Sequence, residues 1–260
     1  MGRTALVTGA SGGIGYALAA VFAENKYDLV IIARSTEKLE DIRREFETRH
    51  GIKVDVITAD LMDPVAPSLI AWEITARGVT IDVLVNNAGF GTWGPFEASD
   101  WQAQAGMLQV NIVALTQLTR LLLPGMLYRG RGSILNVAST AAFAPGPLMS
   151  VYFASKAYVH SFSAALAREV AGRGVTVTCL CPGPTASGFQ QRAANTHIRV
   201  NKDRVLAPAR AVAEYGYRAM VRGQAVAIYG LDNRLVVFLT RFLPTSLVAR
   251  CVQFLQAAST

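Results

Sequence analysis

The sequence predicts an α/β protein with a doubly wound parallel sheet of seven strands flanked by helices. Seven short runs rich in apolar and β-branched residues recur along the 260 residues, at 4–8, 29–33, 54–59, 82–85, 133–137, 175–181 and 225–229. They alternate with helix-length segments, a pattern typical of a parallel sheet covered on both faces. A glycine-rich turn follows the first run directly, as in sheets that hold a nucleotide at their edge.

The helical segments carry signals of their own. Within residues 35–50, Leu39, Ile42 and Phe46 recur at spacings of three and four, and Ser35 stands where an N-cap is expected. A similar helix is expected over residues 16–25, and a long one over 101–129. We find no internal repeat, low-complexity tract or linker, so we expect one domain.

Composition narrows the class of protein. Hydrophobic residues make up 52% and charged residues 17% of the chain. The chain contains no run of eighteen consecutive apolar residues, so we expect no membrane-spanning helix. Met1 leads directly into the first expected strand, so we expect no signal peptide. Cys179, Cys181 and Cys251 form neither a disulfide framework nor a zinc motif, which favours the cytoplasm and no metal. The net charge of +7 is scattered, so we expect a phosphate-bearing ligand and no nucleic acid.

The turn at residues 8–15 reads TGASGGIG. Glycines after a strand and before a helix let the backbone approach a pyrophosphate, which then rests on the helix N-terminus. At the end of the second run, Arg34 suits the 2′-phosphate of NADP, or it is a solvated charge. Asp60, after the third run, either accepts from an adenine amino group or caps the next helix.

Two segments with asparagine each allow more than one interpretation. Residues 86–89 read NNAG after the fourth run, which indicates either a ribose-binding turn or a plain turn. Asn111 interrupts a helical segment, where asparagine is unfavourable, so its amide either opens the helix, binds water or is exposed.

Ser139, Tyr152 and Lys156 form the candidate catalytic group. Tyr152 and Lys156 are four residues apart on an expected helix and share a face. A charge ~4 Å from the phenol contributes ~4 kcal/mol at an effective dielectric of ~20, which predicts a lowered tyrosine pKa. Tyr152 would then exchange a proton, while Ser139 polarises a carbonyl oxygen.

Together these motifs, with Pro182-Gly183, resemble the short-chain dehydrogenase/reductase family in its single-domain form. The resemblance covers residues 4 to about 230, and it implies a Rossmann-type fold and an NADP(H)-dependent oxidoreductase that interconverts a carbonyl and a secondary alcohol. It implies a catalytic set of Asn111, Ser139, Tyr152 and Lys156, in which Asn111 holds a relay water and Lys156 also holds the nicotinamide ribose. It implies further cofactor contacts at Gly9, Ser11, Gly13, Ile14, Gly15, Arg34, Asp60, Asn86, Ala88, Pro182, Gly183 and Thr185.

The resemblance also implies where substrate binds. Its substrate loops correspond to residues 90–99, 143–149 and 186–206, and His197 in the third is expected to be an ordinary surface residue. Their bulky apolar side chains predict a pocket for a hydrophobic carbonyl or alcohol, unless they merely pack the loops. These residues are Phe90, Trp93, Phe96, Phe143, Leu148, Met149 and Phe189.

We expect residues 1–230 to form the dinucleotide-binding and catalytic domain and 231–260 an apolar helical extension. Residues 235–255, with arginines at 241 and 250, predict two amphipathic helices that touch a partner subunit, the substrate cleft or a membrane surface. The resemblance implies a homodimer or homotetramer. Two alternatives for function stay open: a β-ketoacyl-thioester reductase, or a non-catalytic NADPH-binding protein.

Overall fold

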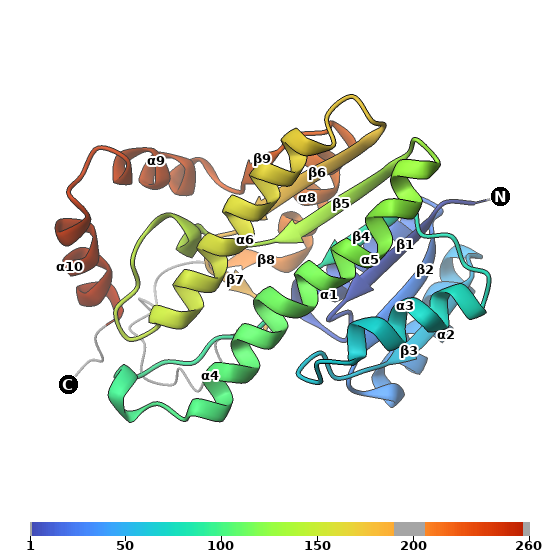
Figure 1. Ribbon diagram of the computed structural model, residues 1–260, viewed down its shortest axis with the longest axis horizontal. Helices are drawn as coiled ribbons and strands as arrows, with labels where there is room; N and C mark the ends of the chain where they lie inside the picture. Colours follow the sequence, from blue (N-terminus) through green and yellow to red (C-terminus); the bar gives the residue numbers. More distant parts are fainter. Residues whose placement is uncertain (1, 190–205, 257–260) are drawn as a thin grey trace.

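The computed structural model describes residues 2–189 and 206–256. Its main sheet has seven parallel strands in the order β3-β2-β1-β4-β5-β6-β9 (Figure 1). These strands are β1 (Thr4–Thr8), β2 (Asp28–Ala33), β3 (Val54–Thr58), β4 (Val83–Asn86), β5 (Gly132–Val137), β6 (Val175–Cys181) and β9 (Val226–Ile228). The predicted doubly wound parallel sheet of seven strands is therefore confirmed.

Strand order reverses at β1, which pairs with β2 on one side and with β4 on the other. Thr8 ties the ends of β1 and β4 together, because its hydroxyl accepts from the backbone N–H groups of Asn87 and Ala88 at 3.0 Å each. In open parallel sheets a ligand crevice forms beyond the carboxyl ends of the strands at such a reversal. The fold thus places a binding crevice beside the glycine turn.

Helices cover both faces of the sheet. One face packs against α1 (Gly13–Glu24), α2 (Thr36–His50) and α8 (Ala209–Val221). The other packs against α3 (Ala66–Ala76), α5 (Leu115–Tyr128) and α6 (Ser150–Glu169), with α4 (Trp101–Leu108) leading into α5 (Figure 1). The predicted α2 is confirmed: Ser35 caps it by accepting from the Lys38 N–H, and Leu39, Ile42 and Phe46 are buried.

The structure adds two local features that the sequence did not predict. A π-helical stretch, Gln109–Ala114, interrupts the long helix expected over residues 101–129. A separate pair of two-residue strands, β7 (Thr185–Ala186) and β8 (Ala207–Pro208), follows β6. Such short pairs carry no periodic signal in the sequence, because they depend on contacts between distant segments.

The segment Trp101–Tyr128 is long and apolar enough to cross a membrane by length and composition. It packs against the fold, however: Met107, Leu115 and Leu118 are buried. A core helix passes the same test of length and hydropathy, so this segment is a packing helix of the domain.

The chain ends in two helices, α9 (Leu231–Thr240) and α10 (Thr245–Gln256), which we call the tail helices. They stand off from the sheet at the end toward which β5 points (Figure 1). The two helices expected in residues 235–255 are thus present, beside the carboxyl ends of the strands.

Candidate active site

A cavity of about 1610 Å³ lies at the carboxyl ends of six strands. At least one residue just after the end of each of β1 to β6 lines the cavity. In strand order these residues are Gly9, Arg34, Asp60, Asn87, Ser139 and Pro182. The cavity is larger than a typical pocket for one small ligand (about 300–1000 Å³). Its size suits a dinucleotide and a second molecule together.

The glycine turn forms one wall. A Cβ on Gly15 would lie 2.2 Å from the Gly9 carbonyl oxygen, so only glycine lets α1 start this close to β1. Gly12 has open space beside it, and Ile14 and Gly15 place the first turn of α1 on the cavity. The N-terminus of a helix and a backbone free of side chains fit a pyrophosphate.

Not every predicted residue of that turn lines the cavity. Gly9, Ser11, Ile14 and Gly15 do, whereas Gly13 packs under the Ser187 backbone, where a Cβ would lie 2.7 Å from the carbonyl oxygen.

The part of the cavity beside the end of β2 carries positive charge. Arg34 and Lys38 are exposed and line the cavity with Ser35. Lys38 was missed from the sequence, although its place one turn after the Ser35 cap was a usable signal. Asp60 also lines the cavity, and its carboxylate accepts from the Met62 N–H at 3.0 Å. That bond closes a turn and does not cap the next helix, because α3 begins at Ala66 after Val65.

Asn86 lies elsewhere than predicted. It is buried in β4, where its amide donates to Thr119 Oγ1 at 3.0 Å and to Asn136 Oδ1 at 2.9 Å. Its neighbour Asn87 lines the cavity instead, and Ala88 does so as predicted. A ribose contact of Asn86 is not supported by this position, because alternate residues of a strand point to opposite sides.

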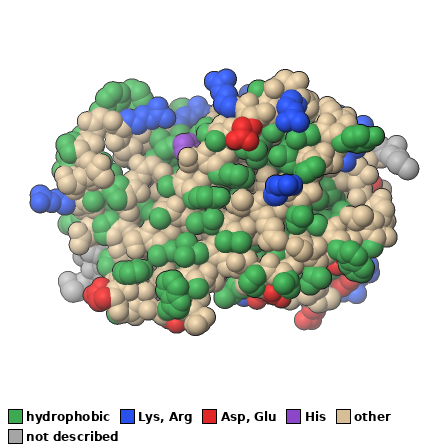
Figure 2. Space-filling view, in the orientation of Figure 1, with side chains coloured by type: hydrophobic (Ala, Val, Ile, Leu, Met, Phe, Trp, Pro, Cys, Tyr) green, Lys and Arg blue, Asp and Glu red, His purple; other side chains and the backbone are tan. Residues whose placement is uncertain are grey.

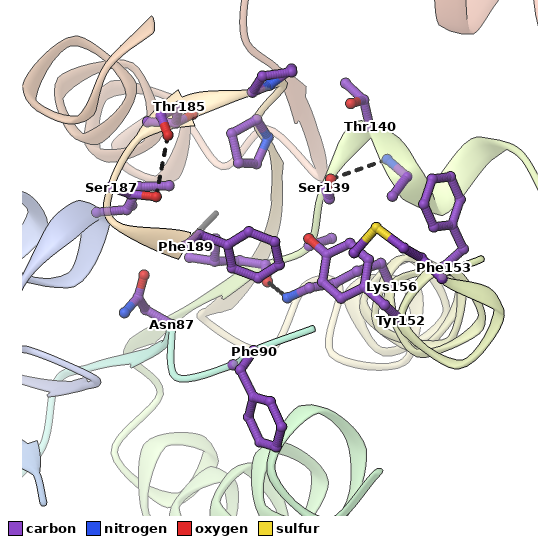
Figure 3. A pocket seen from close by; sticks show the side chains of 18 of the residues that line it. Asn87, Phe90, Ser139, Thr140, Tyr152, Phe153, Lys156, Thr185, Ser187 and Phe189 are labelled. Atoms are coloured by element: carbon purple, nitrogen blue, oxygen red, sulfur yellow. Dashed lines mark hydrogen bonds between the residues drawn. The ribbon is translucent and has the colours of Figure 1, made fainter. Parts of the chain in front are cut away.

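The candidate catalytic side chains meet where β5 and α6 approach each other. Figure 3 shows the phenol oxygen of Tyr152 turned toward Ser139, with Lys156 beside the tyrosine ring. The ammonium of Lys156 lies 5.8 Å from the Tyr152 ring centroid and donates to the Val137 carbonyl oxygen at 2.9 Å. All three residues line the cavity, together with the predicted Pro182, Gly183 and Thr185.

The electrostatics differ from the prediction. Burial raises the pKa of Tyr152 to about 12, and the Ser139 side chain offsets part of that rise. Burial lowers the pKa of Lys156 to about 8, because the charged ammonium is desolvated. The predicted lowering of the Tyr152 pKa is therefore wrong in this structure: desolvation is the largest cause of its shift, and the only effect that lowers it comes from Ser139. Tyr152 is a protonated phenol at neutral pH.

Asn111 acts behind this group, outside the cavity lining. Its side chain accepts from the Phe90 N–H at 3.1 Å, and it donates to the Phe90 carbonyl oxygen and to Ser155 Oγ at 3.0 Å each. The Ser155 hydroxyl in turn donates to the Tyr152 carbonyl oxygen at 2.7 Å. Asn111 lies in the π-helical stretch Gln109–Ala114, which matches the alternative that the helix opens at this residue. The predicted relay water stays a prediction.

The far end of the cavity is apolar. Of the predicted pocket residues, Phe90, Phe143, Met149 and Phe189 line it, and Phe153 was missed. The Phe189 ring lies 5.2 Å from that of Tyr152 (Figure 3). Three predicted residues do not line the cavity: Trp93, Phe96 and Leu148. Most of the third predicted loop, at 190–205, lies outside the described residues, as does His197.

The tail helices close that end. Val237 and Val248 are buried and line the cavity, and Asn233 contacts it next to Gly183. The Trp93 indole N–H donates to the Gln256 carbonyl oxygen at 3.3 Å, which ties α10 to the loop after β4. Of the three alternatives for this segment, contact with the cleft is therefore present in the structure.

Comparison with known proteins agrees with this geometry. Residues 3–197 match the family model described as short chain dehydrogenase. Very-long-chain 3-oxoacyl-CoA reductase of Anas platyrhynchos is 36% identical over 192 residues, which cover 70% of this chain and 59% of that protein. 17-beta-hydroxysteroid dehydrogenase type 3 of Mus musculus is 36% identical over 186 residues, covering 70% and 60%. The chain thus matches less than two thirds of the length of these curated relatives.

A solved structure of similar length has a similar fold. The short-chain dehydrogenase from Sphingobium yanoikuyae in complex with NADPH is 28% identical, with a TM-score of 0.83 and coverage of 99% of both chains. The family model spans most of this chain, and the glycine turn, Ser139, Tyr152 and Lys156 meet at one cavity. The chain belongs to the short-chain dehydrogenase family.

Proposed function

We propose that this chain is an NADP(H)-dependent oxidoreductase that interconverts a carbonyl and a secondary alcohol on a hydrophobic substrate. The observation that carries the proposal is the single cavity that joins the glycine turn to the Ser139, Tyr152 and Lys156 group and continues into an apolar end. The similar Sphingobium yanoikuyae structure in complex with NADPH supports the choice of nucleotide.

Bound NADPH supplies a hydride for the carbonyl carbon. The chain's own residues bind and orient: the turn at residues 9–15 holds the pyrophosphate, Arg34 and Lys38 hold a 2′-phosphate, and Lys156 reaches the nicotinamide ribose. Ser139 orients the substrate carbonyl by donating to its oxygen. The Tyr152 hydroxyl then gives its proton to that oxygen, so the alcohol forms and a phenolate is left to be reprotonated.

The charge states fit Tyr152 as the proton donor to a carbonyl oxygen. A phenol with a pKa of about 12 holds its proton at neutral pH and is ready as an acid. The neighbouring Lys156, with a pKa of about 8, is mostly charged there, which suits a contact with the ribose hydroxyls of the nucleotide.

The decisive test is Tyr152→Phe, measured with a panel of hydrophobic ketones and NADPH oxidation as readout. We expect NADPH binding to persist and turnover to fall by about a hundred- to ten-thousandfold, because the proton donor is gone. Near-full turnover by the variant contradicts the role of Tyr152, and no turnover of any carbonyl by the wild type favours a non-catalytic NADPH-binding protein.

A second candidate is a β-ketoacyl-thioester reductase. Its support is the similarity to very-long-chain 3-oxoacyl-CoA reductase and the net charge of +7, which suits an acidic carrier or coenzyme A. Steady-state rates on 3-oxoacyl thioesters and on free hydrophobic ketones distinguish the two: a kcat/KM much higher for thioesters favours the second.

The proposal includes a homodimer or homotetramer in the cytoplasm. Free cysteines support the compartment: Cys179, Cys181 and Cys251 have no disulfide among the described residues. Exposed apolar side chains on α4, the π-helical stretch, α5 and α6 support the association, among them Trp101, Val113 and Leu121.

A further inference from the structure

The tail helices expose an unusual amount of apolar surface. Ten of the 21 large hydrophobic side chains exposed in the described chain fall within residues 231–256. Leu231, Phe242 and Phe254 are 81%, 71% and 77% exposed. Figure 2 shows apolar side chains gathered at the end of the molecule where α9 and α10 lie. A contiguous surface of this kind marks an interaction site.

The outer side of α9 carries a stripe of exposed apolar residues, which is unusual for a surface helix. Asn233, Val237 and Thr240 recur at spacings of four and three and line the cavity. Leu235 and Phe238 follow Leu231 at spacings of four and three on the other side, where they are exposed. The inner stripe is explained by the cavity, and the outer stripe requires a partner.

Charge indicates which partner fits. Residues 231–256 contain three arginines and one acidic residue, Asp232 in the first turn of α9. All three arginines are exposed, and Arg234 also donates to the Tyr215 hydroxyl and to the Ile228 carbonyl oxygen. Arg250 lies between Leu247 and Phe254 at helical spacing, so a cation stands on the apolar stripe itself. Arginines among exposed apolar side chains fit the headgroup boundary of an anionic lipid bilayer.

The same surface leads into the cavity. Val236, Leu239, Leu243 and Leu255 are exposed, and all four also line the cavity. An apolar path therefore runs from the outer surface of the tail helices to the end of the cavity that holds Tyr152.

We propose that the tail helices lie on an anionic lipid surface and that a lipid-borne hydrophobic substrate passes between them to Tyr152. The proposed lipid binding is argued from the exposed apolar surface and its arginines alone. The proposed passage of substrate rests on the proposed function and names the source of the substrate.

Co-sedimentation with vesicles tests the first half. The probes are phosphatidylcholine vesicles with and without about a third of phosphatidylserine, and the variant is Phe242→Asp/Phe254→Asp. The matched control is Leu69→Asp/Trp72→Asp on α3, whose residues are 57% and 69% exposed. We expect the tail variant to bind the anionic vesicles at least about tenfold more weakly, because two apolar anchors are lost, and the control to bind like the wild type.

The arginines give an independent arm. Arg241→Gln and Arg250→Gln should each weaken binding to anionic vesicles by about fivefold, and high salt should remove that difference. Three results overturn the lipid surface: no binding by the wild type, equal loss in the α3 control, or a tail variant that changes only the oligomeric state without lipid. The last result assigns the surface to a second copy of the chain.

Substrate passage is tested by comparing two ketones. Phe242 and Phe254 do not line the cavity, so the tail variant should reduce a short water-soluble ketone at the wild-type rate. Its rate on a long-chain ketone held in anionic vesicles should fall at least about fivefold, with the KM rather than kcat changed. Equal rates on the vesicle-held ketone overturn the passage. No reduction of either ketone by the wild type instead contradicts the proposed function and leaves the vesicle-binding result standing.

Discussion

Tyr152 and Lys156 show how far a residue pair departs from its sequence pattern once it is buried. Helical spacing places both on one face, as predicted, yet the ammonium bonds the Val137 carbonyl oxygen and desolvation governs both pKa values. Opposite shifts follow, because burial penalises the charged form, which is the deprotonated state of a phenol and the protonated state of an amine.

Lys156 should therefore make stability depend on pH in a defined window. Its folded pKa of about 8 lies below the ordinary 10.5, so between these values the unfolded chain binds more protons than the folded one. Folded-state stability then rises with pH across this window. We expect Lys156→Met to remove a rise on the order of 1.5 kcal/mol between pH 8 and 9.5. Urea unfolding at both pH values measures it, and identical slopes in wild type and variant contradict the lowered pKa.

Arg34 should decide nucleotide choice. Arg34→Asp places a negative charge where we propose the 2′-phosphate, so the NADPH Kd should rise on the order of 100-fold. The NADH Kd should change little, since NADH lacks that phosphate. Arg44→Asp, on the exposed side of α2, makes the same change in net charge and should leave both constants unaffected. Equal loss of both nucleotides refutes the role of Arg34.

Among the elements, the turns that start β5 and β6 fix the sheet register far from the cavity. Gly174 precedes β6 with a φ of +74°, and a Cβ there would lie 1.8 Å from the Gly130 carbonyl oxygen. Gly172, with a φ of +76°, has open space instead. A comparison of substitutions at the two positions therefore distinguishes the cost of the left-handed backbone from the cost of close packing.

Gly174→Ala should lower the free energy of unfolding by at least ~2 kcal/mol more than Gly172→Ala. Both variants bear the left-handed backbone cost of ~1–2 kcal/mol, and only the first forces two backbones apart. Urea unfolding of the two variants measures the difference. Equal destabilisation contradicts the close approach of the two turns.

At the scale of the molecule, the proposed oligomer would bury helix faces that the monomer leaves uncovered. We expect sedimentation equilibrium to give two or four times the chain mass of 27.9 kDa. Leu121→Glu on α5 should shift the wild-type species toward the monomer, because a charge would be buried at the interface. Trp72→Glu on α3 is the control. A single 27.9 kDa species in the wild type refutes the oligomer.

The sequence by itself determined the sheet, the glycine turn and the candidate catalytic pair, because strand runs, turn glycines and helical spacing are local signals. It also indicated two tail helices. Only the tertiary structure decided that Asn87 rather than Asn86 lines the cavity, since one step along a strand changes the side of the sheet. The direction of the Tyr152 pKa shift and the place of residues 231–256 over the cavity were likewise beyond the sequence, because burial and long-range contact exist only after the chain has folded.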